Sequence, residues 1–228
     1  MWRSIEMKLN LSVSATIFLL SALTNLAYAK EINLSKWYVN ATAGASLIND
    51  PNADYMPDSG AESKGKLNVD NGMLLGGGVG YFLMPDIRLE GEVVYRSNDI
   101  SSSSINGFSS QGGADIASVI YMANVYKDFD LFSTSFANFK PYIGLGVGNA
   151  QETDVDITVD GVKQEFSDKN RFAYQALTGI NWYYKSGWFA GLGLRYMDAG
   201  RPRLNGNSGD LKVDYDGLST ELKVGLRF

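Results

Sequence analysis

From Trp37 onward, apolar and polar residues alternate along the chain with a period of two, which is the spacing of a β-strand with two different faces. The last segment is the clearest case, because apolar residues occupy every second position: Leu218, Thr220, Leu222, Val224, Leu226 and Phe228, with Ser219, Glu221, Lys223, Gly225 and Arg227 between them. The same pattern predicts eight strands: 37–46, 72–83, 87–97, 115–127, 139–150, 171–184, 187–198 and 218–228.

The connections between these segments alternate in length. Met84–Asp86 and Lys185–Ser186 are short, and 128–138 is somewhat longer, whereas Asn49–Asp70 and Ser97–Ala114 are long, polar loops. A soluble β-sandwich also alternates apolar and polar residues, so alternation alone does not identify the solvent. Short turns at one end and long loops at the other are typical of transmembrane barrels. We therefore expect an all-β, closed, antiparallel up-and-down barrel with short periplasmic turns and long external loops.

Aromatic residues gather near the strand ends, which predicts two belts at the membrane interfaces. On the short-turn side we assign Trp37, Tyr81, Phe82, Tyr126, Tyr142, Trp182, Tyr184, Trp188 and Phe228 to a belt. On the long-loop side we assign Tyr95, Phe172, Tyr174, Tyr196 and Tyr215.

The polar face of the strands must then line the interior, which side chains fill in a barrel of eight strands. We expect an interior charge network of both signs, because a buried charge without a partner is costly. Its members are Arg88, Glu90, Glu92, Arg96, Lys140, Arg195, Glu221, Lys223 and Arg227. Glycines at every second position leave room for these long side chains: Gly76, Gly78 and Gly80, then Gly144, Gly146 and Gly148, and also Gly191 and Gly193.

Composition removes most catalytic chemistry. The 228 residues include no histidine and no cysteine, which excludes the usual zinc sites, serine–histidine triads, cysteine nucleophiles and disulfides. The formal net charge of −5 argues against a nucleic-acid partner. We expect no catalytic residue, cofactor or metal site, although Glu90, Glu92 and Glu221 leave a carboxylate-only hydrolase as an alternative to ion-paired filling.

Two further motifs have structural explanations. The run Gly144–Gly148 lacks the spacing of a dinucleotide-binding loop, so we interpret it as strand packing. Asp154, Asp156 and Asp160 resemble a calcium loop only in part. Alternation at 155–159 and the turn signal Asp160-Gly161 favour a hairpin there.

The long loops at 49–70 and 150–170 carry more acidic than basic residues, which suits an exposed surface or attraction of a basic partner.

The N-terminal segment has the features of a secretory signal peptide. Arg3 and Lys8 precede the mostly apolar stretch Leu9–Leu23, and Ala27 and Ala29 form an A-x-A cleavage site. We therefore expect residues 1–29 to be removed and residues 30–228 to form the barrel domain. A membrane anchor is the alternative, but the segment is short and contains several polar residues.

Several stretches resemble the opacity-protein and surface-antigen superfamily of eight-stranded outer-membrane barrels, which shares the OmpA/OmpX-type architecture. The resemblance lies in Gly80–Glu92, Met122–Phe129, Phe172–Gln175 and Val224–Phe228, and it extends over essentially all of the mature chain. It implies a bacterial outer-membrane location, contact with outer-membrane lipid, and Phe228 as a signal to the barrel assembly machinery.

The resemblance further implies a surface antigen or adhesin-type interaction protein that contacts host surface proteins through its external loops. A narrow porin-like channel for small solutes is the alternative. A more distant one is a soluble periplasmic lipid-binding barrel, which would need an apolar interior.

Overall fold

The computed structural model describes residues 36–48, 52–57, 63–105, 108–133, 137–159, 162–201, 203–206 and 209–228, all within one compact unit that begins at Lys36. The strands are β1 (Trp37–Ile48), β2 (Asn52–Pro57), β3 (Ser63–Val69), β4 (Gly72–Met84), β5 (Ile87–Ile105), β6 (Phe108–Asp128), β7 (Phe132–Ser133), β8 (Ala137–Val159), β9 (Val162–Tyr184), β10 (Trp188–Asp198), β11 (Arg203–Gly206), β12 (Gly209–Val213) and β13 (Asp216–Arg227). Within the described ranges, no helix has the length and apolar character needed to cross a membrane.

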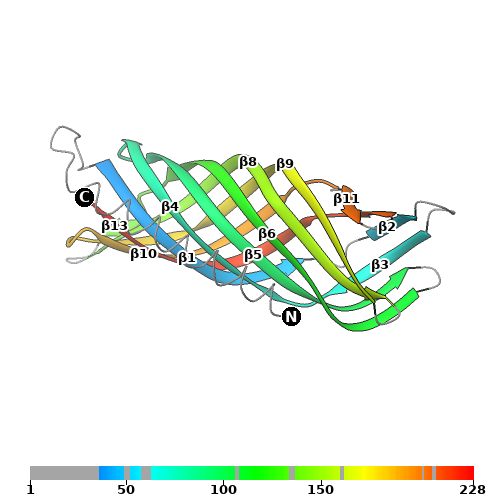
Figure 1. The fold of residues 1–228 in the computed structure, drawn as a ribbon. Coiled ribbons are helices and arrows are strands. Elements are labelled where there is room, and N and C mark those ends of the chain that lie inside the picture. The colour runs from blue at the N-terminus through cyan, green and yellow to red at the C-terminus, as the bar shows by residue number, and fades with distance from the viewer. Residues whose placement is uncertain are drawn as a thin grey trace. The chain divides into compact units, whose positions relative to one another are not determined.

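Eight of these strands close into a ring (Figure 1). β1 pairs with β4 and with β13, and the remaining pairs are β4–β5, β5–β6, β6–β8, β8–β9, β9–β10 and β10–β13, all antiparallel. Each of the eight strands therefore has a hydrogen-bonded neighbour on both sides, and the ring has no open edge. The eight-stranded antiparallel barrel predicted from the sequence is confirmed.

The strands of the ring are staggered. Following the register from Tyr38 leads through Gly80, Glu90, Asn124, Gly146, Gln175, Met197 and Gly217. Gly217 pairs with Ile48, so one circuit returns to β1 ten residues (48 − 38) beyond its starting point. Such a stagger requires the strands to tilt around the barrel axis, and with eight strands it leaves an interior that side chains can fill.

One end of the barrel, the short-turn end, carries the turns at 85–86 and 185–187 and, after β6, the described residues 129–133 with the short strand β7. At the opposite, long-loop end the wall continues as a second ring, which we call the outer rim. There β2, β3, β11 and β12 join the distal parts of β5, β6, β8 and β9 in the order β5–β3–β2–β12–β11–β9–β8–β6. The described parts of segments 49–70 and 97–114, which the sequence predicted as long connections, lie at this end, and they contain paired strands that were not predicted.

The two faces of the strands differ as the alternation predicts. Apolar side chains point outward along the wall, among them Leu89, Leu145 and Leu222, and Leu145 is 66% exposed. Polar side chains alternate with them and are buried inside, with Arg195 1% and Glu92 3% exposed. An outward apolar surface is stable in lipid and not in water, so this distribution fits a barrel embedded in a bilayer.

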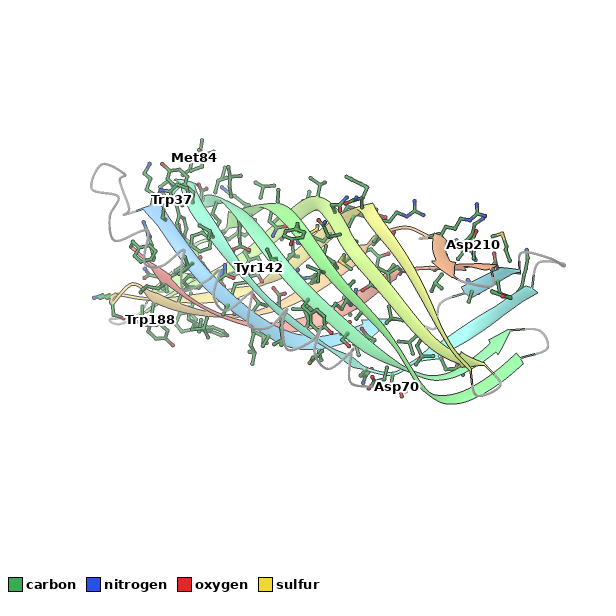
Figure 2. The ribbon with its side chains drawn as sticks, in the orientation of Figure 1. Trp37, Asp70, Met84, Tyr142, Trp188 and Asp210 are labelled. Atoms are coloured by element: carbon green, nitrogen blue, oxygen red, sulfur yellow. The ribbon has the colours of Figure 1, made fainter. Side chains whose placement is uncertain are left out.

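The belts of aromatic residues were assigned only partly correctly. Trp37, Tyr184, Trp188 and Phe228 do lie on the outer face of the short-turn end, where Figure 2 shows Trp37 and Trp188. Phe82, Tyr126, Tyr142 and Tyr215, however, are buried inside the barrel. The face of a strand residue follows from whether its position is odd or even, and nearness to a strand end does not change that.

Candidate functional site

The interior of the barrel, here called the lumen, contains seven of the nine charged residues singled out from the sequence. They come mainly from inward positions of β5, β10 and β13, the strands that carry Arg88, Glu90 and Glu92, then Arg195, then Glu221 and Lys223. β5 is not a neighbour of β10 or β13 in the ring, so contacts among these side chains cross the lumen. Figure 2 draws the side chains along the barrel and labels Tyr142, which is buried inside it.

Arg195 lies between two carboxylates. Its Nη2 is 2.6 Å from Glu92 Oε1 and 2.7 Å from Glu221 Oε2. Nε and Nη1 make further bonds, with Nε donating to Glu221 Oε2 at 3.0 Å and Nη1 donating to Glu92 Oε2 at 3.1 Å. All three side chains are at most 2% exposed. A buried guanidinium with bonds of this kind to two acids joins opposite walls of the barrel.

Glu90 forms a second centre that also crosses the lumen. Its Oε1 accepts hydrogen bonds from Lys223 Nζ at 3.2 Å and from the Tyr126 hydroxyl at 2.9 Å. Its Oε2 accepts hydrogen bonds from the Tyr38 hydroxyl at 2.9 Å and from Asn40 Nδ2 at 2.7 Å. Four donors around one buried carboxylate compensate for its removal from water.

Arg88 connects this centre to the short-turn end. Its Nε lies 3.1 Å from Asp128 Oδ2, and its Nη1 donates to the Tyr38 hydroxyl at 3.2 Å. The guanidinium carbon lies 4.0 Å from the centroid of the Tyr126 ring and 5.2 Å from that of Tyr142. Cation–π contacts therefore add to the ion pair with Asp128.

Aromatic rings fill the lumen at the short-turn end. Tyr38, Phe82 and Phe189 form one buried cluster, and Tyr126, Tyr142 and Leu177 form another. Inward glycines on neighbouring strands give these rings their space, because a Cβ added at Gly80 would clash with the Tyr38 ring and one at Gly144 would lie 2.5 Å from Tyr126 Cδ1. The prediction that alternating glycines make room for interior side chains is confirmed at these positions.

The lumen at the long-loop end is different, because most of its buried side chains are apolar. The cluster there contains Ala53, Ile100, Ile116, Ile120, Met122, Ala150, Ala173, Met197, Ala199, Val213 and Tyr215. We call this group the apolar core. The sequence predicted a polar inner face, and this apolar core was not among the predicted features. The sequence did contain a signal for this core, because Ile116, Ile120 and Met122 occupy even positions of β6, as does the inward-facing Asn124.

Three of the nine proposed network residues lie away from the two carboxylate centres. Arg96 is buried in the long-loop half, where it donates to the Ser46 hydroxyl and lies 5.7 Å from the Tyr215 ring centroid. Lys140 pairs with the exposed Asp130 at 2.8 Å. Arg227 is exposed and lies 4.6 Å from the Phe82 ring centroid. Lys140 and Arg227 have inward parity, but Lys140 lies near the start of β8 and Arg227 is the last residue of β13, so both are at the short-turn end of the barrel.

The chemistry of this arrangement is that of ion pairing. Glu90, Glu92 and Glu221 each bind a cation, so their arrangement matches filling of the lumen better than an acid–base pair poised for hydrolysis. In the part of the chain that the structure describes, no three acidic side chains are grouped to hold a metal ion. The described residues supply no hydrogen-bond partner for Glu221 Oε1 or Arg88 Nη2.

Ala27 and Ala29 of the cleavage site and the turn residues Asp160 and Gly161 lie outside the described residues, although Val159 and Val162 on either side of that turn are paired.

Ion pairs also join segments at both ends of the barrel. In the outer rim, Arg201 binds Asp54 at 3.0 Å and Asp214 at 3.1 Å, which links the β10–β11 connection to β2 and to the segment after β12. At the short-turn end, Lys127 binds Asp86, and its hydrogen bond lowers the pKa of the Asp86 carboxyl. Both sets of contacts are partly exposed, so each adds little to stability.

In a comparison with known protein families, the family model named outer membrane protein beta-barrel domain matches residues 15–228 of the chain. Among solved structures, the outer membrane protein OprG from Pseudomonas aeruginosa is 18% identical with a TM-score of 0.62, covering 85% of this chain and 96% of OprG. Neisserial surface protein A is 18% identical (TM-score 0.47; 84% and 97% covered), and Ail, the attachment invasion locus protein of Yersinia pestis, is 14% identical (TM-score 0.38; 85% and 99% covered). No curated protein sequence matches the chain.

At this level of identity, the likeness to OprG concerns the fold alone. The family match extends over nearly the whole chain and places the protein in the bacterial outer membrane, so the alternative of a soluble periplasmic barrel is wrong. The closed ring of eight antiparallel strands and the apolar outer face agree with that location. The chain belongs to the outer membrane protein β-barrel domain family.

Proposed function

We propose that this barrel is a non-enzymatic surface interaction protein that binds a macromolecular partner through its outer rim. The observation that carries the proposal is the length of four strands. β5, β6, β8 and β9 have 19, 21, 23 and 23 residues, whereas a bilayer needs strands of only about 9–11. The surplus of roughly ten residues, at about 3.3 Å each, projects the wall far beyond the lipid.

The rim has the properties of a binding platform. Its hairpins β2–β3 and β11–β12 pair with each other through β2 and β12 over five residue pairs, from Gly209↔Pro57 to Val213↔Ala53. Arg201 joins them again through its ion pairs with Asp54 and Asp214. A surface fixed by backbone pairing loses less conformational entropy on binding than free loops would, and this favours affinity. The surplus of acidic residues in the loops favours a host surface protein with basic patches.

The filled lumen supports an interaction protein over the narrow porin. A porin needs a continuous wet path, and here Arg195, Glu92 and Glu221 connect opposite walls across the lumen. The apolar core fills the half of the lumen beyond them. Passage of ions through this barrel would require both groups to rearrange.

The proposal is tested by shortening the rim without touching the lumen. In the variant, a short turn replaces residues 101–113 of the β5–β6 hairpin, which spares Ile100 of the apolar core, and a non-adherent laboratory strain displays it at a surface level matched to the parent barrel. We expect the parent to confer attachment to cultured host cells and the shortened variant to lose most of it. The matched control is Lys185→Gln at the short-turn end, which should leave attachment unchanged. Equal attachment by parent and shortened variant, or none by either, would overturn the proposal.

We also propose that Phe228 is the residue by which the barrel assembly machinery receives the chain. Phe228 follows the last strand on an outward position, 37% exposed, and its backbone N–H donates to Trp37 O at 3.0 Å. The test compares Phe228→Ala in cells and in detergent. We expect much less barrel in the outer membrane but near-normal folding of purified protein into micelles, and equal defects in both settings would reduce Phe228 to a structural anchor.

A further inference from the structure

Three segments of the short-turn end lie side by side. They are Lys36–Trp37 at the start of β1, the β9–β10 turn from Tyr184 to Trp188, and Arg227–Phe228 at the end of β13. Arg227 N donates to Gly187 O at 2.9 Å and Phe228 N donates to Trp37 O at 3.0 Å, so backbone bonds join all three. Figure 2 shows Trp37 and Trp188 at this same end of the barrel, away from Asp70 and Asp210. We call these segments the basic sector.

The basic sector combines exposed cations with exposed aromatic rings. Lys36, Lys185 and Arg227 are all exposed, and Lys36 Nζ lies 6.0 Å from the centroid of the Tyr81 ring. Trp188 and Tyr184 are 52% and 44% exposed. The three segments contain no aspartate or glutamate, so even a carboxylate at the end of the chain would leave the sector positive.

The rest of the short-turn end differs in its charge balance. There Lys127 binds Asp86, and Lys140 binds Asp130 at 2.8 Å, so each lysine has an acidic partner close by. The positive charge of this end is therefore concentrated on one side of the barrel. The protein as a whole carries a formal charge of −5, which makes the sector a local exception.

We propose that the basic sector binds anionic phospholipid headgroups in the periplasmic leaflet of the outer membrane. A phospholipid matches both the cations and the aromatic rings of the sector, because its phosphate can contact the cations while its glycerol and upper acyl chains contact the rings. Exposed tryptophan and tyrosine rings prefer the level of the headgroups, and this puts the lysines of the same turns at that level. Clusters of basic residues at a membrane surface attract anionic lipid. This inference rests on the family and the fold and is independent of the proposed adhesive role.

The tryptophans make the sector observable. Trp37, Trp182 and Trp188 are the tryptophans among the described residues, and all belong to strand segments at the short-turn end. Quenching of their fluorescence by lipids brominated on the acyl chains therefore reports which lipids contact this end of the barrel. The probes are brominated phosphatidylglycerol and brominated phosphatidylcholine, each mixed in varied proportion with unlabelled phosphatidylcholine around the purified barrel.

We expect the wild-type barrel to bind phosphatidylglycerol more tightly than phosphatidylcholine, and added salt to weaken this preference because the cations are exposed. Lys36→Gln with Lys185→Gln should reduce the preference by about fivefold for each lysine. The matched control is Lys64→Gln with Lys212→Gln in the outer rim, which removes the same charge at the opposite end and should keep the preference. Equal binding of the two lipids by the wild type, or equal losses in both double variants, would overturn the proposal.

Discussion

The two halves of the lumen are filled in opposite ways. Near the short-turn end, buried charges are paired across the barrel, with Arg195 bound to Glu92 and Glu221. Near the long-loop end, the lumen is filled instead by the apolar core, with residues such as Ile120 and Met197. One ring of strands supports both solutions, because the inward positions accept any side chains that fill the volume and satisfy their own polar atoms.

Substitutions in the two halves should therefore destabilise the barrel for different reasons. In the charged half, the loss of one partner leaves another charge buried, so a single change costs more than the volume it removes. In the apolar half, the cost follows the size of the cavity that is left. Each prediction below concerns the free energy of unfolding of the barrel, measured by urea titration in detergent micelles.

The largest effect is expected for Arg195→Met. This change keeps most of the side-chain volume but leaves Glu92 and Glu221 without their shared cation. We expect a loss of about 3–5 kcal/mol. Leu194→Met, at the adjacent outward position, is the matched control and should be nearly neutral because Leu194 is 44% exposed. A small loss for Arg195→Met would mean that the charges contribute little and that the two halves do not differ.

A smaller effect is expected for Ile120→Ala in the apolar core, where Ile120 is fully buried. The cavity and the lost transfer free energy together should cost about 3 kcal/mol. The comparison is sharpened by Ile120→Val, for which about 1 kcal/mol is expected. If both variants were neutral, residues around Ile120 would have to collapse freely, and the apolar core would not be a packed core.

Gly144→Ala tests the packing of rings in the charged half. The added Cβ would lie 2.5 Å from Tyr126 Cδ1, so the ring that binds Glu90 and Arg88 must shift. We expect a loss of about 1–3 kcal/mol from overpacking. Gly91→Ala is the matched control, because no atom lies within 4 Å of the Cβ it would gain. Equal results for the two glycines would mean that the space beside Tyr126 is not limiting.

The smallest effect is expected for Arg201→Ala in the outer rim. Arg201 pairs with Asp54 and Asp214, but its side chain is 41% exposed, so screening by water limits the contribution. We expect a loss of less than about 1 kcal/mol. A loss as large as that of Arg195→Met would show that the rim, and not the lumen, governs the stability of the barrel.

The sequence predicted the membrane-spanning barrel well because one physical rule acts on every strand there. Outward residues must be apolar in lipid, so parity reveals both faces, and Arg88, Glu90 and Glu92 were placed inside on that basis. The assignment of Phe82, Tyr126 and Tyr142 to the aromatic belt was wrong, because these residues lie near strand ends but at inward positions.

The outer rim could not be predicted in the same way. Beyond the lipid, water surrounds the strand and allows polar residues on both faces, so β3 and the distal part of β5 show no alternation that separates them from loops. Their pairing also depends on partners far apart in the chain, as in β2 with β12. The apolar core lies at the junction of these two regimes, where inward residues such as Ile116 are apolar and the outward pattern no longer contrasts with them.

Side chains close the lumen of this barrel, and the decisive test is ion conductance across a planar lipid bilayer. Purified barrel is added to the bilayer in concentrated potassium chloride, and insertion is verified by digestion of the exposed rim with protease. We expect inserted wild-type barrels to carry no steady current above that of the bare bilayer, because the side chains of Arg195, Glu92 and Glu221 and the apolar core fill the path. A stable conductance step that persists with each inserted barrel would contradict it.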